Sequence, residues 1–388
     1  MAIGMQGFGT YEQDDRGRLC YRPPSAPPFP KMEIVWKPYE RALTAVNAFD
    51  QALNEFPISG VIGSLFARLD AVHSSGAEGS TTTFTDLMEY QTSLKRAPDP
   101  EDARSVAAAA QAFDELSDGE SRWSPAKTVL EIHRRLFQSA RDPMVAAGSG
   151  QWKTYPNGTF DPECSGSTFY YTLPKSTPAA MAEWQDFSLA EGDQPDLIRQ
   201  ALSHWMFEHI HPVPDGNGRV GRLMVPLLMK RKGALRTACA FLGEAVHQNR
   251  NVYVDALKDG RLTGDMGSWT RVFCSMVAQT AQANLDRLAG LRRIHQHWLE
   301  RTAASFRSHS VAHRLVPYAI TRPLFTVRDA QAFAGGTFHA LNLAIVRLVD
   351  MGLLTLHGRS QRDRLFATAD VLALFEPIRS GQPPPCRP

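Results

Sequence analysis

Twelve residues near the middle of the chain combine side chains that could carry out phosphoryl chemistry. Residues 211–222 read His-Pro-Val-Pro-Asp-Gly-Asn-Gly-Arg-Val-Gly-Arg. His211 has a pKa suited to accepting a proton at neutral pH, and Asp215 supplies the hard oxygen ligand that Mg²⁺ prefers. Arg219 and Arg222 are three residues apart, so in a helix they share a face and can both contact phosphate oxygens. The types and order of these residues predict a site of phosphoryl or nucleotidyl transfer.

The residues around this motif predict a helix on each side of a loop. Apolar residues recur at near-helical spacing before it, at Leu202, Trp205, Met206 and Ile210. An apolar run of helical length follows over residues 223–229. The loop then lies at the start of the second helix, where unpaired N–H groups attract phosphate. Because Gly216 and Gly218 tolerate positive φ, we expect the backbone of residues 216–218 to bind phosphates, with the Asn217 amide as a further donor.

This string resembles the signature of the Fic family, His-x-Phe-x-(Asp/Glu)-Gly-Asn-Gly-Arg-x-x-Arg, and residues 201–212 resemble the family's preceding helix. It departs at Val213, where the family usually has Phe, and the smaller side chain would anchor the loop in the core less firmly. The resemblance implies transfer of AMP from ATP to a Tyr, Thr or Ser hydroxyl of a protein. In that reaction His211 accepts the hydroxyl proton and Asp215 holds Mg²⁺ against the α- and β-phosphates. The two arginines of the motif neutralise the β- and γ-phosphates.

A second, shorter motif lies upstream, where a predicted helix over residues 60–75 ends. Ser74, Glu78 and Gly79 match the family's inhibitory pattern, (Ser/Thr)-x-x-x-Glu-(Gly/Asn). The resemblance implies that Glu78 reaches Arg222 and prevents productive binding of the γ-phosphate, because a carboxylate competes with phosphate for one guanidinium. The alternative is an ordinary helix end with a solvated glutamate.

The region 148–175 differs in composition from its neighbours and predicts a β-hairpin. An Asn157-Gly158 turn signal is followed by β-branched and aromatic residues over 167–174. In the Fic family a hairpin flap here aligns the target by strand addition. The flap residues are then expected to be Phe169, Tyr170, Tyr171, Thr172 and Leu173. Lys153 stands where the family commonly has Arg, and a hairpin that only covers the core is the alternative.

Residues 249–253 resemble the family's Asn-Arg-x-x-Tyr segment, which flanks the adenine end of the site. Asn249 and Tyr253 are therefore expected to bind nucleotide, although an ordinary core tyrosine is an equal alternative.

An imidazole and a carboxylate near the motif, His204 and Glu208, could also be metal ligands, which would make the protein a metal hydrolase. That alternative is remote, because no standard zinc spacing emerges.

The pattern changes after about residue 310. Helices over 326–334 and 337–351 are followed by a predicted hairpin, an order that resembles a winged helix. Thr337, His339 and Asn342 would lie near the start of the recognition helix. Basic residues would lie on the wing, at Arg359, Arg362 and Arg364. Such a unit binds either DNA or protein, and both remain open.

Composition is that of an ordinary soluble globular chain. The 388 residues are 43% hydrophobic and 21% charged with a net charge of +2, which makes no overall case for nucleic acid. Cysteines are scattered, at Cys20, Cys164, Cys239, Cys274 and Cys386. This unpatterned set predicts reduced thiols and a cytoplasmic setting. We see no signal peptide and no apolar run long enough for a membrane span.

Together these observations predict a mainly α protein with a Fic-type helical core, a β-hairpin flap and a C-terminal winged helix-turn-helix domain. The expected parts are a Pro-rich N-terminal arm (1–30), a helical region with the inhibitory motif (31–122), the Fic core (123–306), the winged helix (310–376) and a disordered tail (377–388). The expected ligands are ATP and Mg²⁺, and the expected partner is a protein with an exposed hydroxyl. Removal of AMP, another nucleotide donor, and a nucleotide-sensing DNA-binding regulator are the alternatives. The family resemblance also allows a homodimer.

Overall fold

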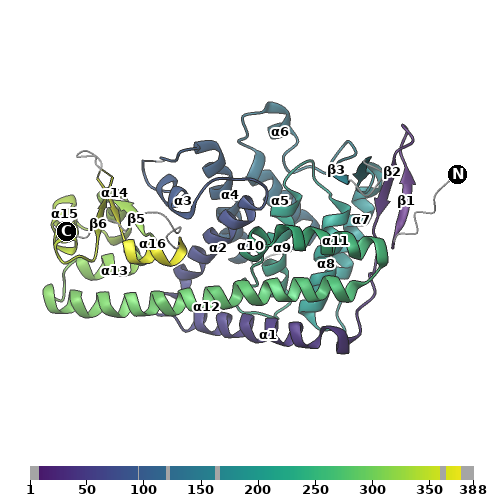
Figure 1. The fold of residues 1–388 in the computed structure, drawn as a ribbon. Helices are drawn as coiled ribbons and strands as arrows, with labels where there is room; N and C mark the ends of the chain where they lie inside the picture. The colour runs from purple at the N-terminus through teal and green to yellow at the C-terminus, as the bar shows by residue number, and fades with distance from the viewer. Residues whose placement is uncertain (1–7, 95, 119–122, 162–166, 359–363, 377–388) are drawn as a thin grey trace.

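The structure is a computed structural model, and it describes residues 8–94, 96–118, 123–161, 167–358 and 364–376. Helices form most of the described chain, accompanied by two small sheets (Figure 1). The predicted mainly α fold is therefore confirmed. The arginines at 359 and 362 and the tail 377–388, for which predictions were made, lie outside the described residues.

The N-terminal helices follow the predicted apolar periodicity closely. They are α1 (Met32–Asn54), α2 (Ser59–Gly76), α3 (Phe84–Tyr90) and α4 (Pro100–Asp118). The helix α3 begins where Thr83 and Asp86 form a capping box, each side chain accepting from the other residue's backbone N–H. The end of α2 leads directly into the turn that carries Glu78.

Seven helices of the central region surround the motif. They are α5 (Pro125–Phe137), α6 (Pro143–Ala147), α7 (Thr177–Leu189), α8 (Asp196–Ile210), α9 (Asn217–Arg231), α10 (Gly243–Gln248) and α11 (Arg250–Thr263), with a short 3₁₀ turn η1 (Pro174–Ser176) before α7. The motif therefore joins α8 to α9, as the sequence predicts.

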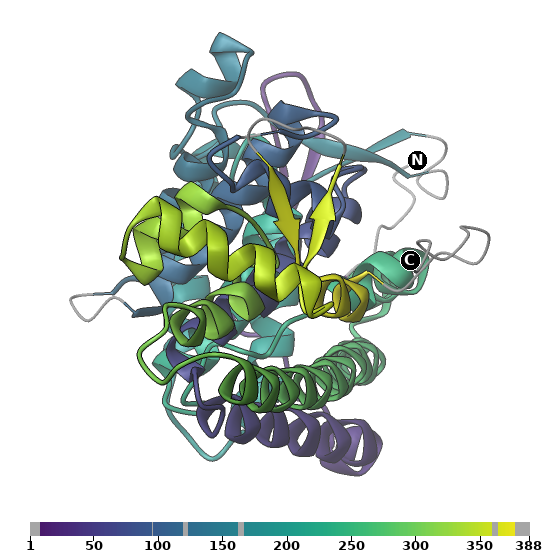
Figure 2. The ribbon, with the colours of Figure 1, turned by 90° about the vertical axis from the view of Figure 1, so that its left-hand side faces the viewer.

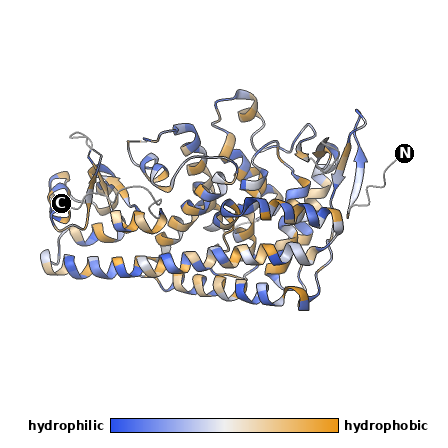
Figure 3. Ribbon diagram, viewed as in Figure 1, coloured by the Kyte–Doolittle hydropathy of each residue, from blue (hydrophilic) through white to orange (hydrophobic). Residues whose placement is uncertain are grey.

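One long helix, α12 (Met266–Ser305), runs along the whole molecule. Its 40 residues span about 60 Å at 1.5 Å per residue. Helix α1 lies beside it in both views (Figures 1 and 2), and both helices alternate between polar and apolar residues along their length (Figure 3). The far end of α12 carries the C-terminal unit.

The first sheet has the strand order β1-β2-β4-β3. Its strands are β1 (Thr10–Gln13), β2 (Leu19–Arg22), β3 (Gly158–Asp161) and β4 (Ser167–Tyr170). The predicted hairpin is the antiparallel pair β3–β4, and β2 joins β4 in parallel at Cys20 and Tyr170. The pair β1–β2 was not predicted, because the prolines that follow it indicated only a Pro-rich arm over residues 1–30.

The C-terminal unit contains its helices and strands in the predicted order. They are α13 (Ala312–Thr321), β5 (Leu324–Thr326), α14 (Val327–Ala334), α15 (Phe338–Asp350), β6 (Thr355–His357), β7 (Leu365–Ala367) and α16 (Ala369–Phe375). The strands form a sheet of order β5-β7-β6. Arg364 donates to Asn342 Oδ1 at 2.6 Å, so it ties the hairpin to α15. The assignment of this unit as a winged helix stays a prediction.

The apolar cores of these parts are continuous. One cluster of buried side chains extends from Tyr21 to Phe375, and the Phe375 ring stacks on Phe84 of α3 with centroids 4.8 Å apart. The predicted domain boundaries do not coincide with separate apolar cores, and they stay predictions.

Among the described residues no single helix has the length and apolarity to cross a membrane. Only the bent pair α14–α15, with 112° between its helices, has them when the two are taken together. Cys20, Cys239 and Cys274 are free and buried.

Several histidines are packed inside the fold. Burial lowers the pKa of His204, His209 and His211 to about 3, and that of His73 and His133 to about 4. These side chains are therefore neutral when folded across the physiological range. Burial has the opposite effect on two acids, raising the pKa of Asp70 to about 7 and that of Glu208 to about 8.

We predict that the fold loses stability as the pH falls from about 6.5 to 5. Below about 6.5 the unfolded histidines bind protons and the folded ones do not, so each lowers the free energy of unfolding by about 1.4 kcal/mol per pH unit. Asp70 and Glu208 are protonated only in the folded state in this window and act in the opposite direction. The five histidines outnumber these two acids.

Urea unfolding at pH 7, 6 and 5 measures this effect. The midpoint should fall with each step, and His209→Gln should reduce the slope of the unfolding free energy against pH by about one proton's worth, roughly 1.4 kcal/mol per unit. A midpoint that does not change between pH 7 and 5 would contradict the prediction.

Candidate active site

His211 occupies a strained position at the end of α8. Its backbone has φ 51° and ψ 59°, and among the described residues it is the only non-glycine with positive φ. Such a conformation costs on the order of 1–3 kcal/mol and persists only where the surroundings enforce it. The strain lies at the residue that the motif assigns as the base.

The imidazole of His211 is held in a defined protonation state. Its Nδ1 lies 3.2 Å from the carbonyl oxygen of Glu208, and a carbonyl only accepts, so Nδ1 carries the proton and Nε2 has the free lone pair. The ring stacks face to face on Tyr171, with centroids 4.0 Å apart and planes 7° apart. Burial, and secondarily the charge of Lys153, lower the pKa of His211. The group is therefore a neutral base.

The loop after His211 closes on itself through Asn217. The side chain of Asn217 accepts from the Val213 N–H at 3.0 Å and donates to the Val213 carbonyl at 2.8 Å. Both polar atoms of the amide therefore contact the loop, and donation from its second N–H to phosphate stays a prediction. Val213 itself is fully buried. A phosphate-binding role for the backbone of residues 216–218 stays a prediction.

The start of α9 presents N–H groups without a side-chain cap. Gly216 is the N-cap residue with φ 73°, and no side chain accepts from the first turn. These N–H groups and the helix dipole favour an anion. A Cβ added to Gly218 would lie 2.2 Å from Oε1 of Glu78. The carboxylate of Glu78 therefore lies directly against this first turn, in the position that suits an anionic ligand.

Arg222 brings the predicted inhibitory residues into contact with the motif. Its Nη2 donates to Glu78 Oε1 at 2.7 Å and to the Ser74 carbonyl at 2.8 Å, and its Nε donates to Ser74 Oγ at 2.9 Å. Burial opposes ionisation of Glu78, yet the charge of Arg222 holds the pKa of this carboxyl below its usual value. The structure thus places Glu78 on the guanidinium that the family resemblance predicts it contacts, and it adds two contacts from Ser74.

The second arginine of the motif has different neighbours. Arg219 donates to Ser105 Oγ of α4 at 3.0 Å and lies over the Phe137 ring at 4.9 Å. Its Nη2 is 3.8 Å from Oδ2 of Asp215, whose side chain is 71% exposed. One exposed carboxylate fits Mg²⁺ that arrives with a nucleotide, because Mg²⁺ commonly takes one or two protein carboxylates plus phosphate oxygens. Among the described residues no group of three or more potential ligands is present.

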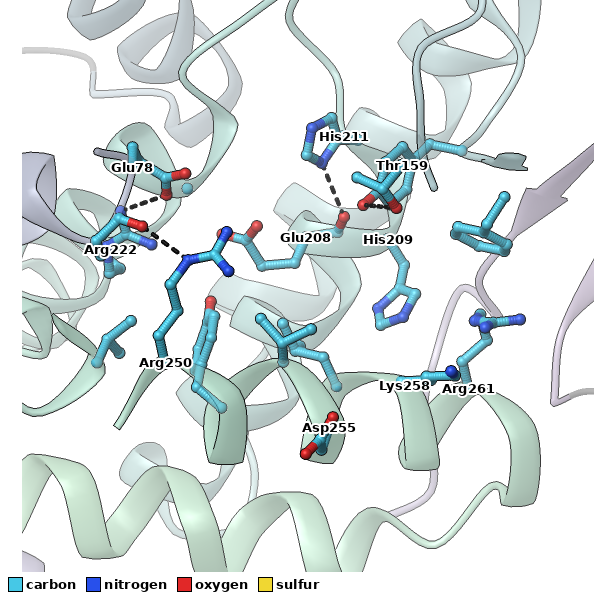
Figure 4. A pocket seen from close by; sticks show the side chains of 18 of the residues that line it. Glu78, Thr159, Glu208, His209, His211, Arg222, Arg250, Asp255, Lys258 and Arg261 are labelled. Carbon is cyan, nitrogen blue, oxygen red and sulfur yellow. Dashed lines mark hydrogen bonds and ion pairs between the residues drawn. The ribbon is translucent and has the colours of Figure 1, made fainter. Parts of the chain in front are cut away.

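A pocket of about 540 Å³ joins these groups, a size suited to a small ligand. Glu78 and Arg222 lie at one end and His211 lies across from them, with Arg250 between (Figure 4). Helix α11 supplies an apolar wall, made by Tyr253, Val254 and Leu257. The pocket therefore combines an anion-binding end, a neutral base and an apolar wall.

The two predicted residues of the 249–253 segment differ in their placement. Tyr253 lines the pocket, and its hydroxyl lies 2.8 Å from His204 Nε2. Asn249 does not line it: its amide donates to the Ala245 carbonyl at 3.0 Å and so caps α10. A nucleotide contact by Asn249 stays a prediction. His204 is hydrogen-bonded to the Tyr253 hydroxyl and His209 to the Trp205 carbonyl, and both rings are buried and neutral.

Sequence reasoning missed the basic residues of α11. Arg250, Lys258 and Arg261 line the pocket, and Arg250 donates from Nε to the Ala77 carbonyl at 2.8 Å, next to Glu78. Arg261 lies over the Phe169 ring at 4.0 Å. Arg250 is eight residues before Lys258, which is three residues before Arg261, and this helical spacing was a signal of a shared face.

The residues of the predicted target-docking flap differ in their surroundings. Thr172 and Leu173 follow β4 and are buried, and Thr172 Oγ1 donates to the Tyr21 carbonyl at 3.1 Å. Strand β4 pairs with β3 along its length and with β2 at Tyr170. Tyr171 stacks on His211, and Tyr170 lies under Arg18 at 5.0 Å. The free edge of the sheet near the pocket is β3, and docking by strand addition stays a prediction.

Comparison with known proteins gives consistent results. The model of the Fic/DOC family matches residues 123–229. The chain is 25% identical over 254 residues to protein adenylyltransferase Fic of Culex quinquefasciatus, covering 63% of this chain and 45% of that protein. It is 37% identical over 143 residues to a probable protein adenylyltransferase of Aquifex aeolicus, covering 34% and 42%. The chain spans less than half the length of the curated relatives it matches.

Solved structures share the fold. A Fic family protein from Desulfovibrio desulfuricans superposes with a TM-score of 0.55 at 15% identity, covering 88% of this chain and 98% of that one. A Fic-domain signalling protein from Bacteroides thetaiotaomicron gives a TM-score of 0.51 at 19% identity, covering 64% and 97%. The family model and the named relatives agree that the chain carries a Fic domain over residues 123–229, and the solved structures share its fold.

Proposed function

We propose that the protein transfers AMP from ATP to a Tyr, Thr or Ser hydroxyl of another protein, and that Glu78 inhibits this transfer. The observation that carries the proposal is the position of the Glu78 carboxylate. It occupies the uncapped first turn of α9 and pairs with Arg222, inside the pocket that also holds the neutral base His211. Relatives named protein adenylyltransferase support the choice of donor.

The proposed chemistry follows from the lone pair on His211 Nε2. This atom accepts the proton of the target hydroxyl while the hydroxyl oxygen attacks the α-phosphorus. The bond from the α-phosphorus to the bridging oxygen breaks, its electron pair stays with that oxygen, and pyrophosphate leaves. Negative charge on the bound phosphates raises the proton affinity of the imidazole, so the low pKa of the free site does not prevent proton transfer.

The remaining groups position and neutralise the phosphates. The N–H groups at the start of α9 would donate to phosphate oxygens, and Arg222, freed from Glu78, would pair with the terminal phosphates. Asp215 would hold Mg²⁺, which offsets phosphate charge when bound. Most of the rate enhancement then comes from positioning and charge stabilisation.

Removal of AMP by water is the second candidate, and one observation favours it. The Glu78 side chain is 39% exposed within the pocket even while it pairs with Arg222. An ionised carboxylate there could orient a water molecule toward a modified target.

The C-terminal unit favours a protein partner over DNA. The side chains of Phe333, Phe338 and Leu343 on α14 and α15 are more than half exposed. An apolar surface of this kind suits protein contact more than the phosphate backbone, which is bound mainly by Lys and Arg. We therefore assign partner contact to this unit, and a fluorescently labelled DNA duplex should show no saturable binding at physiological salt.

The central prediction concerns Glu78. In Glu78→Gly, label from ATP carrying ³²P in the α-phosphate should appear on the protein itself or on proteins of a cell lysate, because Arg222 is released. Adding His211→Ala should reduce the rate by roughly 10²–10⁴, the range for loss of a general base. Release of AMP from labelled protein by the parent chain would instead support the second candidate. No label in any sample, with ATP binding intact, would contradict transfer of AMP from ATP.

A matched pair of serines tests the inhibitory contact. Ser74→Ala removes a hydrogen bond to Arg222, and hydrogen bonds to charged groups contribute about 1.5–3 kcal/mol. Transfer by the otherwise unchanged chain should rise, by about tenfold. Ser75→Ala is the control, because Ser75 is equally buried and its hydroxyl has no partner. Equal rates for the two variants would show that Ser74 has no part in inhibition.

A further inference from the structure

Two residues outside the motif contact four consecutive carbonyl groups of the catalytic loop. The backbone N–H of Lys153 donates to the Pro212 carbonyl at 2.9 Å, and its Nζ donates to the Ile210 carbonyl at 3.0 Å. The side-chain Nδ2 of Asn157 donates to the carbonyls of His211 and Val213, at 3.2 and 3.0 Å. We call Lys153 and Asn157, with these four bonds, the carbonyl clamp.

The loop requires such donors for a physical reason. The last carbonyls of a helix have no partner within it, and the turn at His211 directs the following carbonyls away from α8. Buried carbonyl groups without donors are costly. The clamp supplies these donors and thereby opposes relaxation of the left-handed His211 backbone to an ordinary conformation.

Lys153 is chemically unusual at this place. It is 2% exposed, and the described residues give it no carboxylate partner; Nζ donates to Asn157 Oδ1 at 2.8 Å. Burial lowers the pKa of Lys153 to about 7. Both Nζ bonds survive loss of the proton, since a neutral amine keeps two N–H groups. The clamp therefore works on either side of neutral pH.

Asn157 also acts on the His211 imidazole through Tyr171. Its carbonyl accepts from the Tyr171 N–H at 3.1 Å, and the Tyr171 ring stacks on His211. The next residue, Gly158, begins β3, the free edge strand beside the pocket. One side chain and its carbonyl thus connect the His211 backbone, the ring that covers His211, and the sheet edge.

We propose that Lys153 and Asn157 are positioning residues that fix the orientation of the His211 imidazole for proton transfer. For its kinetic consequences this inference rests on the proposed function. Neither residue touches the reacting atoms; both act through the backbone of the base and, for Asn157, through Tyr171. Misplacement of a catalytic group by about 1 Å costs on the order of 10²-fold in rate.

The substitution Asn157→Asp separates this role from a merely structural one. Aspartate keeps the size and can pair with Lys153, but it cannot donate to the carbonyls of His211 and Val213. In the Glu78→Gly background, Asn157→Asp should therefore lower kcat as much as Asn157→Ala, by on the order of 10²-fold, with little change in KM for ATP. Lys153→Arg, which keeps charged donors, should retain more activity than Lys153→Met.

Thermal midpoints exclude simple unfolding, and Gln151→Ala is the matched control. Gln151 is exposed, lies in the same segment and donates to Ala147, not to the loop. Full activity of Asn157→Asp would overturn the inference. So would a change in KM as large as the change in kcat, because a positioning defect acts on the chemical step.

A measurement without turnover keeps the inference testable if the proposed reaction is wrong. In protein labelled with ¹⁵N-histidine, the His211 resonances, assigned by their loss in His211→Ala, should report one neutral tautomer with the proton on Nδ1 from pH 5 to 8. Asn157→Asp should mix the tautomers or restore titration near the ordinary value of about 6.5. Unchanged His211 resonances would refute the clamp. Altered resonances with no AMP transfer in any sample would refute only the reaction.

Discussion

Arg222 is almost fully buried, and its positive charge must be satisfied by the groups packed around it. In the described state those groups are the hydroxyl and carbonyl of Ser74 and the carboxylate of Glu78. Helix α9 can place the guanidinium there because Gly221 allows α8 to approach closely: a Cβ on Gly221 would lie 2.5 Å from Glu208 Oε1. The same charge would satisfy a nucleotide's terminal phosphates, so under the proposed function the ion pair and the ligand would exclude each other.

The turn that carries Glu78 is positioned by several independent contacts. Asp102 of α4 accepts from Ser80 and from Thr82, just beyond the glutamate, and Arg250 of α11 donates to the Ala77 carbonyl just before it. Elements from three regions of the chain thus fix one carboxylate. Displacing Glu78 requires breaking its bond to Arg222, while these backbone contacts can remain.

Opposite the ion pair, the catalytic loop is fixed by contacts of a different kind. The loop between α8 and α9 has a strained residue at its start and two prolines, so it has few hydrogen bonds of its own. Asn217 closes it from within, and Lys153 and Asn157 hold it from outside. The base and the turn that carries Glu78 are therefore positioned separately, by hydrogen bonds to backbone carbonyls in one case and by paired charges in the other.

The sequence by itself determined the helices and the motif, because both depend on local patterns. Apolar periodicity placed α2 and the helices on either side of residues 211–222, and the order of residues in the motif gave the resemblance to the Fic family. β-branched and aromatic residues predicted a hairpin in the region 148–175, but the turn signal at Asn157 and Gly158 lies at the start of β3 and not between the two strands. Even the pairing of Glu78 with Arg222 came from a sequence pattern, through the family resemblance.

Only the tertiary structure decided which partners distant residues have. Strand β2 pairs with β4 at Cys20 and Tyr170, and no local signal in the N-terminal arm indicates this pairing. The inward direction of the Asn217 amide, the capping role of Asn249 and the clamp formed by Lys153 and Asn157 depend on hydrogen bonds to backbone carbonyls. Backbone carbonyls are identical at every residue, so sequence patterns carry no information about which of them a side chain will meet once the helices have packed.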